Sequence, residues 1–206
     1  MPPENEKDSA ALKGKARPAY SSKHLLRRAV GDTAYRTLTQ TPRIANFLLR
    51  PNYEPEIYAL PQLVPSNATC FDIGANYGLY SRVLSPMAGK AGKIYAFEPS
   101  RMTFRGLKMC TLMLGLKNVQ IHQCAMSDGI GELTLTIPAK AHGGLGIALA
   151  HLGAAEDTGG TTEIVHVDTL DHFVNDHHIT ACDFIKCDVE GAELRVLQGG
   201  IETLTR

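Results

Sequence analysis

Residues 68–78 read ATCFDIGANYG, a short apolar run that ends in an acidic residue and a turn with two glycines. The run has the length and composition of a buried strand, and after it apolar residues recur at helical spacing from Leu79 to Met87. The segment therefore predicts a strand, a glycine turn and a helix. In open α/β sheets this unit holds nucleotide-like ligands, because backbone N–H groups and the helix N-terminus face the ligand.

The turn from Asp72 to Gly78 has the pattern DxGxNxG, which differs from the GxGxxG pattern of dinucleotide-binding domains. A carboxylate at the strand end would repel a pyrophosphate and suits a cationic or hydroxylated ligand better. These two features disfavour a nicotinamide-dependent oxidoreductase. A purely structural interpretation stays open, in which the glycines only make a tight turn and Asp72 caps the following helix.

A second acidic residue, Glu98, follows the next predicted strand in the segment GKIYAFEPS, residues 92–100. A carboxylate at this place can accept hydrogen bonds from two ribose hydroxyls, as the acidic residue of dinucleotide-binding domains does. Pro99 then removes one backbone donor and ends the strand pairing. Acids at the ends of two successive strands favour a ligand-binding crevice over a plain turn.

The rest of the chain continues as alternating strands and helices. Continuous apolar runs predict buried strands, and alternation of apolar with polar residues predicts half-exposed strands at a sheet edge. Asp171 is expected to cap a short helix, and the glycine-rich residues 141–160 predict a long loop that is functional or disordered. The expected elements are a helix over residues 104–114, a third strand over 119–127, half-exposed strands over 131–138 and 161–170, a fourth, buried strand over 181–191 and a helix over 193–204.

The composition indicates an ordinary globular protein with one main domain. The chain has 206 residues, of which 44% are hydrophobic and 20% charged. Its formal charge of zero provides no general attraction to nucleic acid or to an anionic membrane. We expect a flexible tail over residues 1–20, an N-terminal helical cap over residues 21–60 and the α/β domain over residues 61–206.

The cysteines and the apolar runs bear on location. The five cysteines are scattered and form no zinc-binding spacing, so reduced thiols in the cytoplasm are the simplest interpretation. The polar start MPPENEKDSA does not resemble a signal peptide, and no apolar run reaches the roughly 20 residues that cross a bilayer. We therefore expect a cytoplasmic protein without a transmembrane segment.

Four sequence motifs, spread over about residues 55–206, resemble the FkbM family of methyltransferases in their order and spacing. The resemblance implies a Rossmann-like class I methyltransferase fold with a doubly wound, mostly parallel sheet that binds S-adenosylmethionine. It also implies methylation of a hydroxyl group on a small molecule or a sugar. The motifs are FDIGANYGLYS at residues 71–81, YAFEPS at 95–100, CAMSD at 124–128 and FIKCDVEGAELRVLQG at 184–199.

The resemblance also implies a cofactor site built from the first three motifs. The glycine turn would surround the methionine and ribose part of the cofactor, and the acid after the second strand would hold the ribose diol. Ser127 and Asp128 would lie beside the adenine, although a polar turn before an edge strand is an open alternative for this pair. The cofactor-binding residues expected on this basis are Asp72, Gly74, Asn76, Tyr77, Glu98, Ser127 and Asp128.

Asp188 and Glu190 follow the fourth predicted strand and are the candidate catalytic residues. Methyl transfer needs the acceptor oxygen held near attack distance and its proton removed, and a carboxylate can do both. The pair could instead hold Mg²⁺, or Glu190 could only cap the next helix. We expect no metal, because a single Asp-x-Glu is a weak metal signal. Lys186 could be a charge partner for a site carboxylate.

The sequence ends inside the helix that follows the fourth strand, whereas the family's fold continues further. The expected fold is thus C-terminally truncated, with an open sheet edge at the fourth strand. A second copy of the chain, in a homo-oligomer, or the N-terminal helices could cover this edge. The alternative to an active O-methyltransferase is a catalytically inactive remnant that binds the cofactor only. No sequence feature names the methyl acceptor.

Overall fold

The computed structural model describes residues 42–49, 54–138, 151–152 and 161–206. The chain divides into two compact units, Met1–Thr39 and Gln40–Arg206, and all of the described residues belong to the second. The expected tail, much of the expected helical cap and most of the glycine-rich loop lie outside the described residues. The domain boundaries proposed from the sequence therefore stay predictions.

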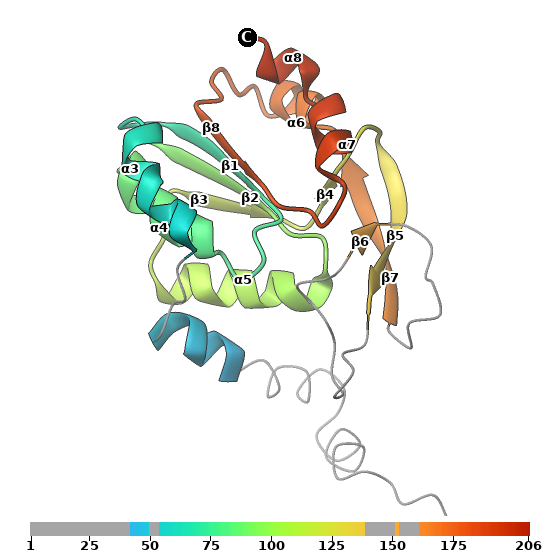
Figure 1. Ribbon diagram of the computed structural model, residues 1–206, viewed down its shortest axis with the longest axis horizontal. Helices are drawn as coiled ribbons and strands as arrows, with labels where there is room; N and C mark the ends of the chain where they lie inside the picture. The colour runs from blue at the N-terminus through green and yellow to red at the C-terminus, as the bar shows by residue number, and fades with distance from the viewer. Residues whose placement is uncertain (1–41, 50–53, 139–150, 153–160) are drawn as a thin grey trace, which may run out of the picture. The chain divides into compact units, whose positions relative to one another are not determined.

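A four-stranded parallel sheet forms the centre of the described fold (Figure 1). Its strand order is β3-β2-β1-β8, so the chain starts in the middle, builds outward to one side and later returns to the other side of β1. The first, second and fourth strands expected from the sequence are confirmed. The strands are β1 (Thr69–Ile73), β2 (Lys93–Phe97), β3 (Val119–His122) and β8 (Phe184–Cys187).

Helices cover both faces of this sheet, because successive side chains of its inner strands point to opposite sides. Ile94 and its neighbours on one face pack with helices α4 and α5, whereas Tyr95 and its neighbours on the other face pack with α6 and α7. Burial on both sides explains why β1 and β2 read as continuous apolar runs. The helices are 3-10 helix η1 (Pro55–Ala59), α3 (Leu60–Leu63), α4 (Leu79–Ala88), α5 (Arg101–Met113), α6 (Leu170–Asp176), α7 (Glu193–Gln198) and α8 (Ile201–Leu204), besides a helix over residues 42–49.

The single strand expected over residues 119–127, the third along the chain, is wrong, because part of this segment belongs to a second sheet. That segment bends after β3 and continues as β4, a two-residue strand that belongs to a different sheet. The alternating pattern of the segment fits one long strand and two short ones equally well. The second sheet has the order β4-β7-β5-β6, with β5 and β7 antiparallel, and consists of β4 (Ala125–Met126), β5 (Gly131–Ile137), β6 (His151–Leu152) and β7 (Thr161–Asp168).

The C-terminal helices also differ from the prediction. The helix expected over residues 193–204 is split into α7 and α8 at Gly199 and Gly200. A Cβ atom at Gly199 would lie 2.0 Å from the carbonyl oxygen of Ser127, so a tertiary contact requires glycine where the helix breaks. β8 is half-buried, not fully buried as expected, because within the described strands it pairs only with β1.

Thr169, and not Asp171, caps the helix α6. The side chain of Thr169 accepts a hydrogen bond from His172 N–H at 3.1 Å. The carboxylate of Asp171 turns instead to α8, where it accepts from the backbone N–H groups of Glu202 and Thr203 at 3.0 and 2.7 Å. The prediction that Asp171 caps α6 is therefore wrong, and Asp171 instead fastens α8 to α6.

Candidate functional site

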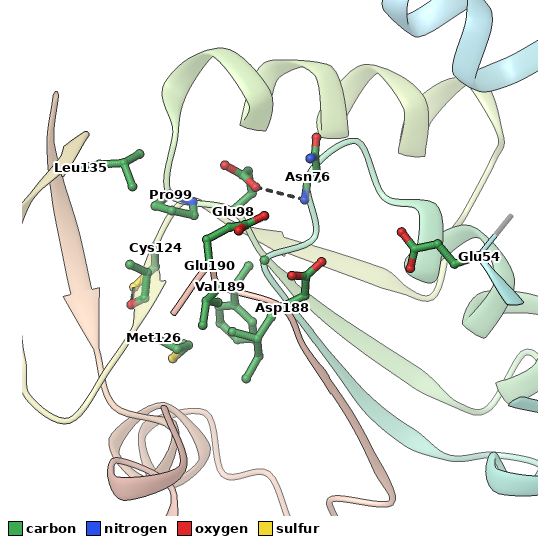
Figure 2. A pocket seen from close by; sticks show the side chains of 14 residues that line it. Glu54, Asn76, Glu98, Pro99, Cys124, Met126, Leu135, Asp188, Val189 and Glu190 are labelled. Atoms are coloured by element: carbon green, nitrogen blue, oxygen red, sulfur yellow. Dashed lines mark hydrogen bonds between the residues drawn. The ribbon is translucent and has the colours of Figure 1, made fainter. Parts of the chain in front are cut away.

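A cavity of about 270 Å³ lies where the carboxyl ends of β1, β2 and β8 meet the start of β4 (Figure 2). Parallel strands place their carboxyl ends at one edge, which is where open α/β sheets bind ligands. Leu135 of β5 contributes from the second sheet. The residues predicted from the sequence that line the cavity are Gly74, Asn76, Glu98, Asp188 and Glu190.

The glycine turn brings the ends of β1 and β8 together. Gly74 has a φ of +74°, and a Cβ atom there would lie 2.0 Å from the backbone oxygen of Asp188. The N–H groups of Gly74 and Ala75 both donate to the carbonyl of Phe97, at 3.1 and 2.8 Å. Only glycine combines this left-handed conformation with so close an approach. The turn therefore sets the position of Asp188 as well as its own.

Glu98 is a nearly buried carboxylate in the cavity wall, with 8% of its surface exposed. Its Oε2 accepts from Asn76 N–H at 3.0 Å (Figure 2), and its Oε1 accepts from Ser100 N–H at the same distance. Burial raises the pKa of Glu98 to about 7, although these two N–H groups and Lys186 act in the opposite direction. Each oxygen keeps acceptor capacity, so the group can bind two hydroxyl donors.

Asp72 lies behind the cavity and does not line it. The side chain has no exposed surface, and its Oδ2 accepts from the backbone N–H and the hydroxyl of Ser81, in the first turn of α4, at 2.9 and 2.6 Å. Its Oδ1 is 3.6 Å from Nζ of Lys186. These contacts match the structural alternative, in which Asp72 caps the helix after the glycine turn. Its expected contact with the cofactor stays a prediction.

Three further residues expected around the cofactor lie off the cavity wall. The ring of Tyr77 packs on α5, where a Cβ atom at Gly106 would be 2.4 Å from Cε1 of the ring. The Ser127 hydroxyl donates to Asp128 at 3.0 Å, and this hydrogen bond is the main cause that lowers the pKa of Asp128. Both residues directly follow Met126, which does line the cavity. Their place beside the adenine stays a prediction.

The loop after β8 carries both candidate catalytic residues into the cavity (Figure 2). Asp188 has 60% of its side chain exposed, and its N–H donates to the carbonyl of Ile73 at 3.1 Å. Glu190 has a φ of +52°, an uncommon backbone conformation for a residue other than glycine that often marks functional sites. Among the described residues, no side chain makes a capping hydrogen bond at the N-terminus of α7, which contradicts the alternative that Glu190 only caps the next helix. Glu193 accepts instead from the N–H groups of Val189 and Gly191 in the loop before α7, each at 3.2 Å.

Two further residues belong to the site: Lys186, expected as a possible charge partner for a site carboxylate, and Glu54, which the sequence did not suggest. Lys186 donates to the carbonyl of Gly74 at 2.7 Å, and its Nζ lies 3.7 Å from Asp188. Its signal was a lysine inside an otherwise apolar strand. Glu54 lines the cavity and accepts from the Tyr80 hydroxyl at 2.8 Å. No local sequence pattern pointed to Glu54, because its position at the cavity depends on how the neighbouring helix η1 packs.

Neither metal ligation nor membrane insertion is visible in the described structure. Among residues 42–49, 54–138, 151–152 and 161–206, no group of three or more His, Cys, Asp and Glu side chains is arranged to hold a metal ion. In the same part of the chain, no helix has the length and apolar character that crossing a membrane requires.

A doubly wound sheet with a glycine turn after β1 and an acid after β2 has the architecture of Rossmann-like methyltransferases. The family model of the Methyltransferase FkbM domain matches residues 72–206. The chain therefore belongs to the FkbM methyltransferase family, which confirms the resemblance seen in its motifs. S-adenosylmethionine, the cofactor expected from the sequence, is confirmed at the level of this family.

The chain is also similar to individual methyltransferases. Methyltransferase sdnD from Sordaria araneosa is 30% identical over 179 residues, which cover 75% of this chain and 68% of the relative. A crystal structure of Methyltransferase FkbM from Methylobacillus flagellatus shows 18% identity and a TM-score of 0.48, covering 89% of this chain and 44% of that one. A SAM-dependent methyltransferase from Aquifex aeolicus shows 24% identity and a TM-score of 0.34, covering 53% and 52%. The chain thus spans about half the length of these two solved proteins.

The cavity residues fit S-adenosylmethionine. Glu98 offers two carboxylate oxygens with free acceptor capacity to a ribose diol. Asn76 lines the same cavity, and its Oδ1 is buried without a hydrogen-bond partner among the described residues. A buried amide oxygen without a partner is costly, and a ligand with hydroxyl or ammonium donors would remove that cost.

Proposed function

We propose that this chain is an S-adenosylmethionine-dependent O-methyltransferase that acts on a hydroxyl group of a small molecule or a sugar. One observation carries the proposal. A single cavity holds the buried carboxylate of Glu98 on the cofactor side and the carboxylates of Asp188 and Glu190 after β8. The first suits a ribose diol, and the other two suit an acceptor hydroxyl.

The cofactor half of the site consists of the glycine turn and Glu98. The turn holds Asn76 N–H on Glu98, and this contact fixes the carboxylate in the cavity wall. Asp72 acts from behind by holding the start of α4 through Ser81. When bound, S-adenosylmethionine supplies a methyl group activated on a positively charged sulfur.

The acceptor half consists of Asp188 and Glu190. A carboxylate that accepts a hydrogen bond from the acceptor hydroxyl fixes the oxygen for attack and takes its proton as the oxygen loses it. Asp188 is suited to this role, because it lines the cavity and its exposed side chain can pass the proton on to water. Glu190 lines the same cavity and would orient a second polar group of the acceptor. The proposal includes no metal, since one carboxylate is enough for both tasks.

Titration calorimetry with S-adenosylmethionine and S-adenosylhomocysteine tests the cofactor half. The wild-type chain is expected to bind both ligands, and Glu98→Ala is expected to bind neither measurably. Glu132→Ala, at an exposed position of β5, is the matched control and is expected to bind as the wild type does. A folded wild-type chain that binds neither ligand would overturn the proposal.

A transfer screen tests the acceptor half. Methyl-labelled S-adenosylmethionine is incubated with the wild-type chain and a panel of sugars, cyclic alcohols and other hydroxylated small molecules, and products are identified by mass spectrometry. An oxygen-linked methyl group on one of them supports the proposal. Cofactor binding without transfer to any member of the panel would favour the inactive, cofactor-binding remnant.

We further propose that the chain works in the cytoplasm. All five cysteines are free, and three of them, Cys70, Cys110 and Cys124, are buried. Unpaired thiols are typical of a reducing compartment, which supports this location. Localisation of a fluorescently tagged full chain in its native cell checks it. A homo-oligomer that covers the exposed side of β8 stays a prediction of the sequence.

A further inference from the structure

Lys186 is a nearly buried cation at the end of the central sheet. Only 10% of its side chain is exposed, and β8 places it in register with Asp72 of β1. Its Nζ donates to the carbonyl oxygen of Gly74 at 2.7 Å and makes a longer contact of 3.4 Å with that of Ile73. A buried ammonium is tolerated only where several partners replace water, and here strand-end carbonyls do so.

Two carboxylates flank the same ammonium. Nζ of Lys186 lies 3.6 Å from Oδ1 of Asp72 and 3.7 Å from Oδ2 of Asp188. The ring of Tyr80 lies 5.3 Å from Nζ, within the range of a cation–π contact. Gly74 and Asp72 belong to the cofactor half of the site, and Asp188 belongs to the acceptor half. One ammonium therefore contacts both halves.

The Gly74 carbonyl is the contact with the clearest consequence. Gly74 adopts a φ of +74° and begins the turn whose next residues donate to Phe97 and Glu98. A carbonyl in such a turn lies outside the ladder of hydrogen bonds between strands. A side-chain donor is therefore needed to hold its direction. Lys186 supplies this donor through a short, charge-assisted hydrogen bond.

We propose that Lys186 is a positioning residue for both halves of the site. It fixes the Gly74 carbonyl, so that the turn keeps Asn76 N–H on Glu98, and it holds the carboxylate of Asp188 at the cavity edge. It is not among the residues that line the cavity, so it acts through these neighbours. This inference rests on the proposed function, because it concerns the same cofactor site.

Calorimetry on Lys186→Met tests the inference, with Lys93→Met, at the exposed start of β2, as the matched control. Lys186→Met is expected to bind S-adenosylmethionine and S-adenosylhomocysteine roughly tenfold more weakly, as the loss of a charge-assisted hydrogen bond implies. The two ligands differ by a positive charge at sulfur, so equal losses indicate that Lys186 acts through the turn. Lys93→Met is expected to bind both as the wild type does.

The pH midpoint of cofactor binding distinguishes a positioning role from a merely structural one, because loss of a merely structural residue would leave this midpoint unchanged. The groups that act on Glu98 are the N–H groups of Ser100 and Asn76, the cation of Lys186 and the carboxylate of Glu163. Without Lys186, Glu98 loses the one cation among them, so binding is expected to need a higher pH. A folded Lys186→Met variant that keeps the wild-type affinity, or loses affinity with an unchanged pH midpoint, would overturn the proposal.

A second variant covers the case in which Lys186→Met does not fold because Asp72 is left buried and unpaired. The double variant Asp72→Asn with Lys186→Met removes both charges, and Asp72→Asn alone is its reference. The double variant is expected to bind more weakly than this reference and at a higher pH midpoint; equal affinity and midpoint would overturn the proposal. A wild-type chain that does not bind the cofactor overturns the proposed function as well, which separates the two failures.

Discussion

The backbone N–H of Asn76 donates a 3.0 Å hydrogen bond to Oε2 of Glu98, which fastens the glycine turn after β1 to the acid after β2. Ser100 N–H holds the other carboxylate oxygen at the same distance. Two backbone donors therefore orient the carboxylate, and its role in the cavity depends on both oxygens being acceptors.

Replacing Glu98 with Gln is expected to weaken S-adenosylhomocysteine binding at least about tenfold. A Gln amide has one oxygen, so its NH₂ group must face the N–H of either Asn76 or Ser100, and the variant loses one hydroxyl acceptor as well. Titration calorimetry measures the affinity, with Glu132→Gln as the control. Wild-type affinity in a folded Glu98→Gln variant would place the ribose elsewhere.

The raised pKa of Glu98, about 7, predicts opposite pH trends for binding and for stability. Cofactor binding needs the carboxylate, so affinity is expected to fall as the pH drops through 7. The ligand-free fold prefers the protonated form, because the pKa is raised above its usual value of 4.5. The stability contributed by this group is thus fully present below about pH 4.5 and is lost as the pH rises through 7.

Thermal unfolding between pH 5.5 and 8.5, with and without S-adenosylhomocysteine, checks both trends. The difference between wild type and Glu98→Gln isolates the contribution of this carboxyl group from those of other titrating groups. A ligand-induced increase in melting temperature that does not depend on pH in the wild type would contradict the assignment of Glu98 as the titrating contact.

Gly74→Ala is expected to reduce the free energy of unfolding by about 2 kcal/mol or more, and to weaken cofactor binding. The new Cβ atom would meet the Asp188 backbone oxygen at 2.0 Å, and the φ of +74° disfavours any side chain. Gly129→Ala is the matched control, because a Cβ atom there has no neighbour within 4 Å. Denaturant unfolding measures the stability of both variants. Equal free energies of unfolding would show that the turn tolerates a side chain.

Much of the fold follows from the sequence, because its inner strands are buried on both faces and leave continuous apolar runs. The parts that were wrong depend on tertiary contacts. The break between β3 and β4 is not visible in an alternating pattern, and the break at Gly199 depends on the approach of the Ser127 carbonyl.

The candidate site shows the same division. Parallel strands end at one edge, so acids after two strands could be expected to share a cavity, and Glu98 and Asp188 do. Sequence alone does not determine whether a strand-end side chain points into the crevice or toward a helix, and Asp72 points toward α4. Glu54 reaches the cavity from the segment before η1, and the position of that segment depends on packing that the sequence does not reveal. Lys186 could be expected to pair with a site carboxylate, but its hydrogen bond to the Gly74 carbonyl could not be read from the sequence.

Glu193→Ala is expected to destabilise the loop that carries the acceptor residues by about 1 kcal/mol, the usual net contribution of such hydrogen bonds. Its carboxylate accepts from the N–H groups of Val189 and Gly191. Glu193→Gln keeps one acceptor oxygen and is expected to lose less, and Glu190→Ala, which removes neither of these hydrogen bonds, should lose least. Denaturant unfolding of the three variants gives the order; a larger loss in Glu190→Ala than in Glu193→Ala would contradict the assignment of Glu193 as the residue that holds this loop.

Asp188→Asn is expected to lower the rate of methyl transfer by roughly 10²-fold, the usual effect of losing a general base, while cofactor affinity stays within about threefold of wild type. The amide keeps the shape and one acceptor oxygen, but it cannot take the acceptor's proton. The side chain is 60% exposed, and the nearly buried Lys186 keeps Asp72 as a charge partner, so the fold should be retained.

Single-turnover transfer to the acceptor found in the screen, measured beside calorimetry on the same preparation, separates chemistry from binding. Glu190→Gln is the paired variant, expected to raise the KM for the acceptor more than it lowers kcat, because Glu190 would orient the acceptor and not take its proton. If Asp188→Asn transfers at the wild-type rate and Glu190→Gln does not, the roles of the two carboxylates are exchanged. If both transfer at the wild-type rate, the acceptor oxygen is deprotonated by another group.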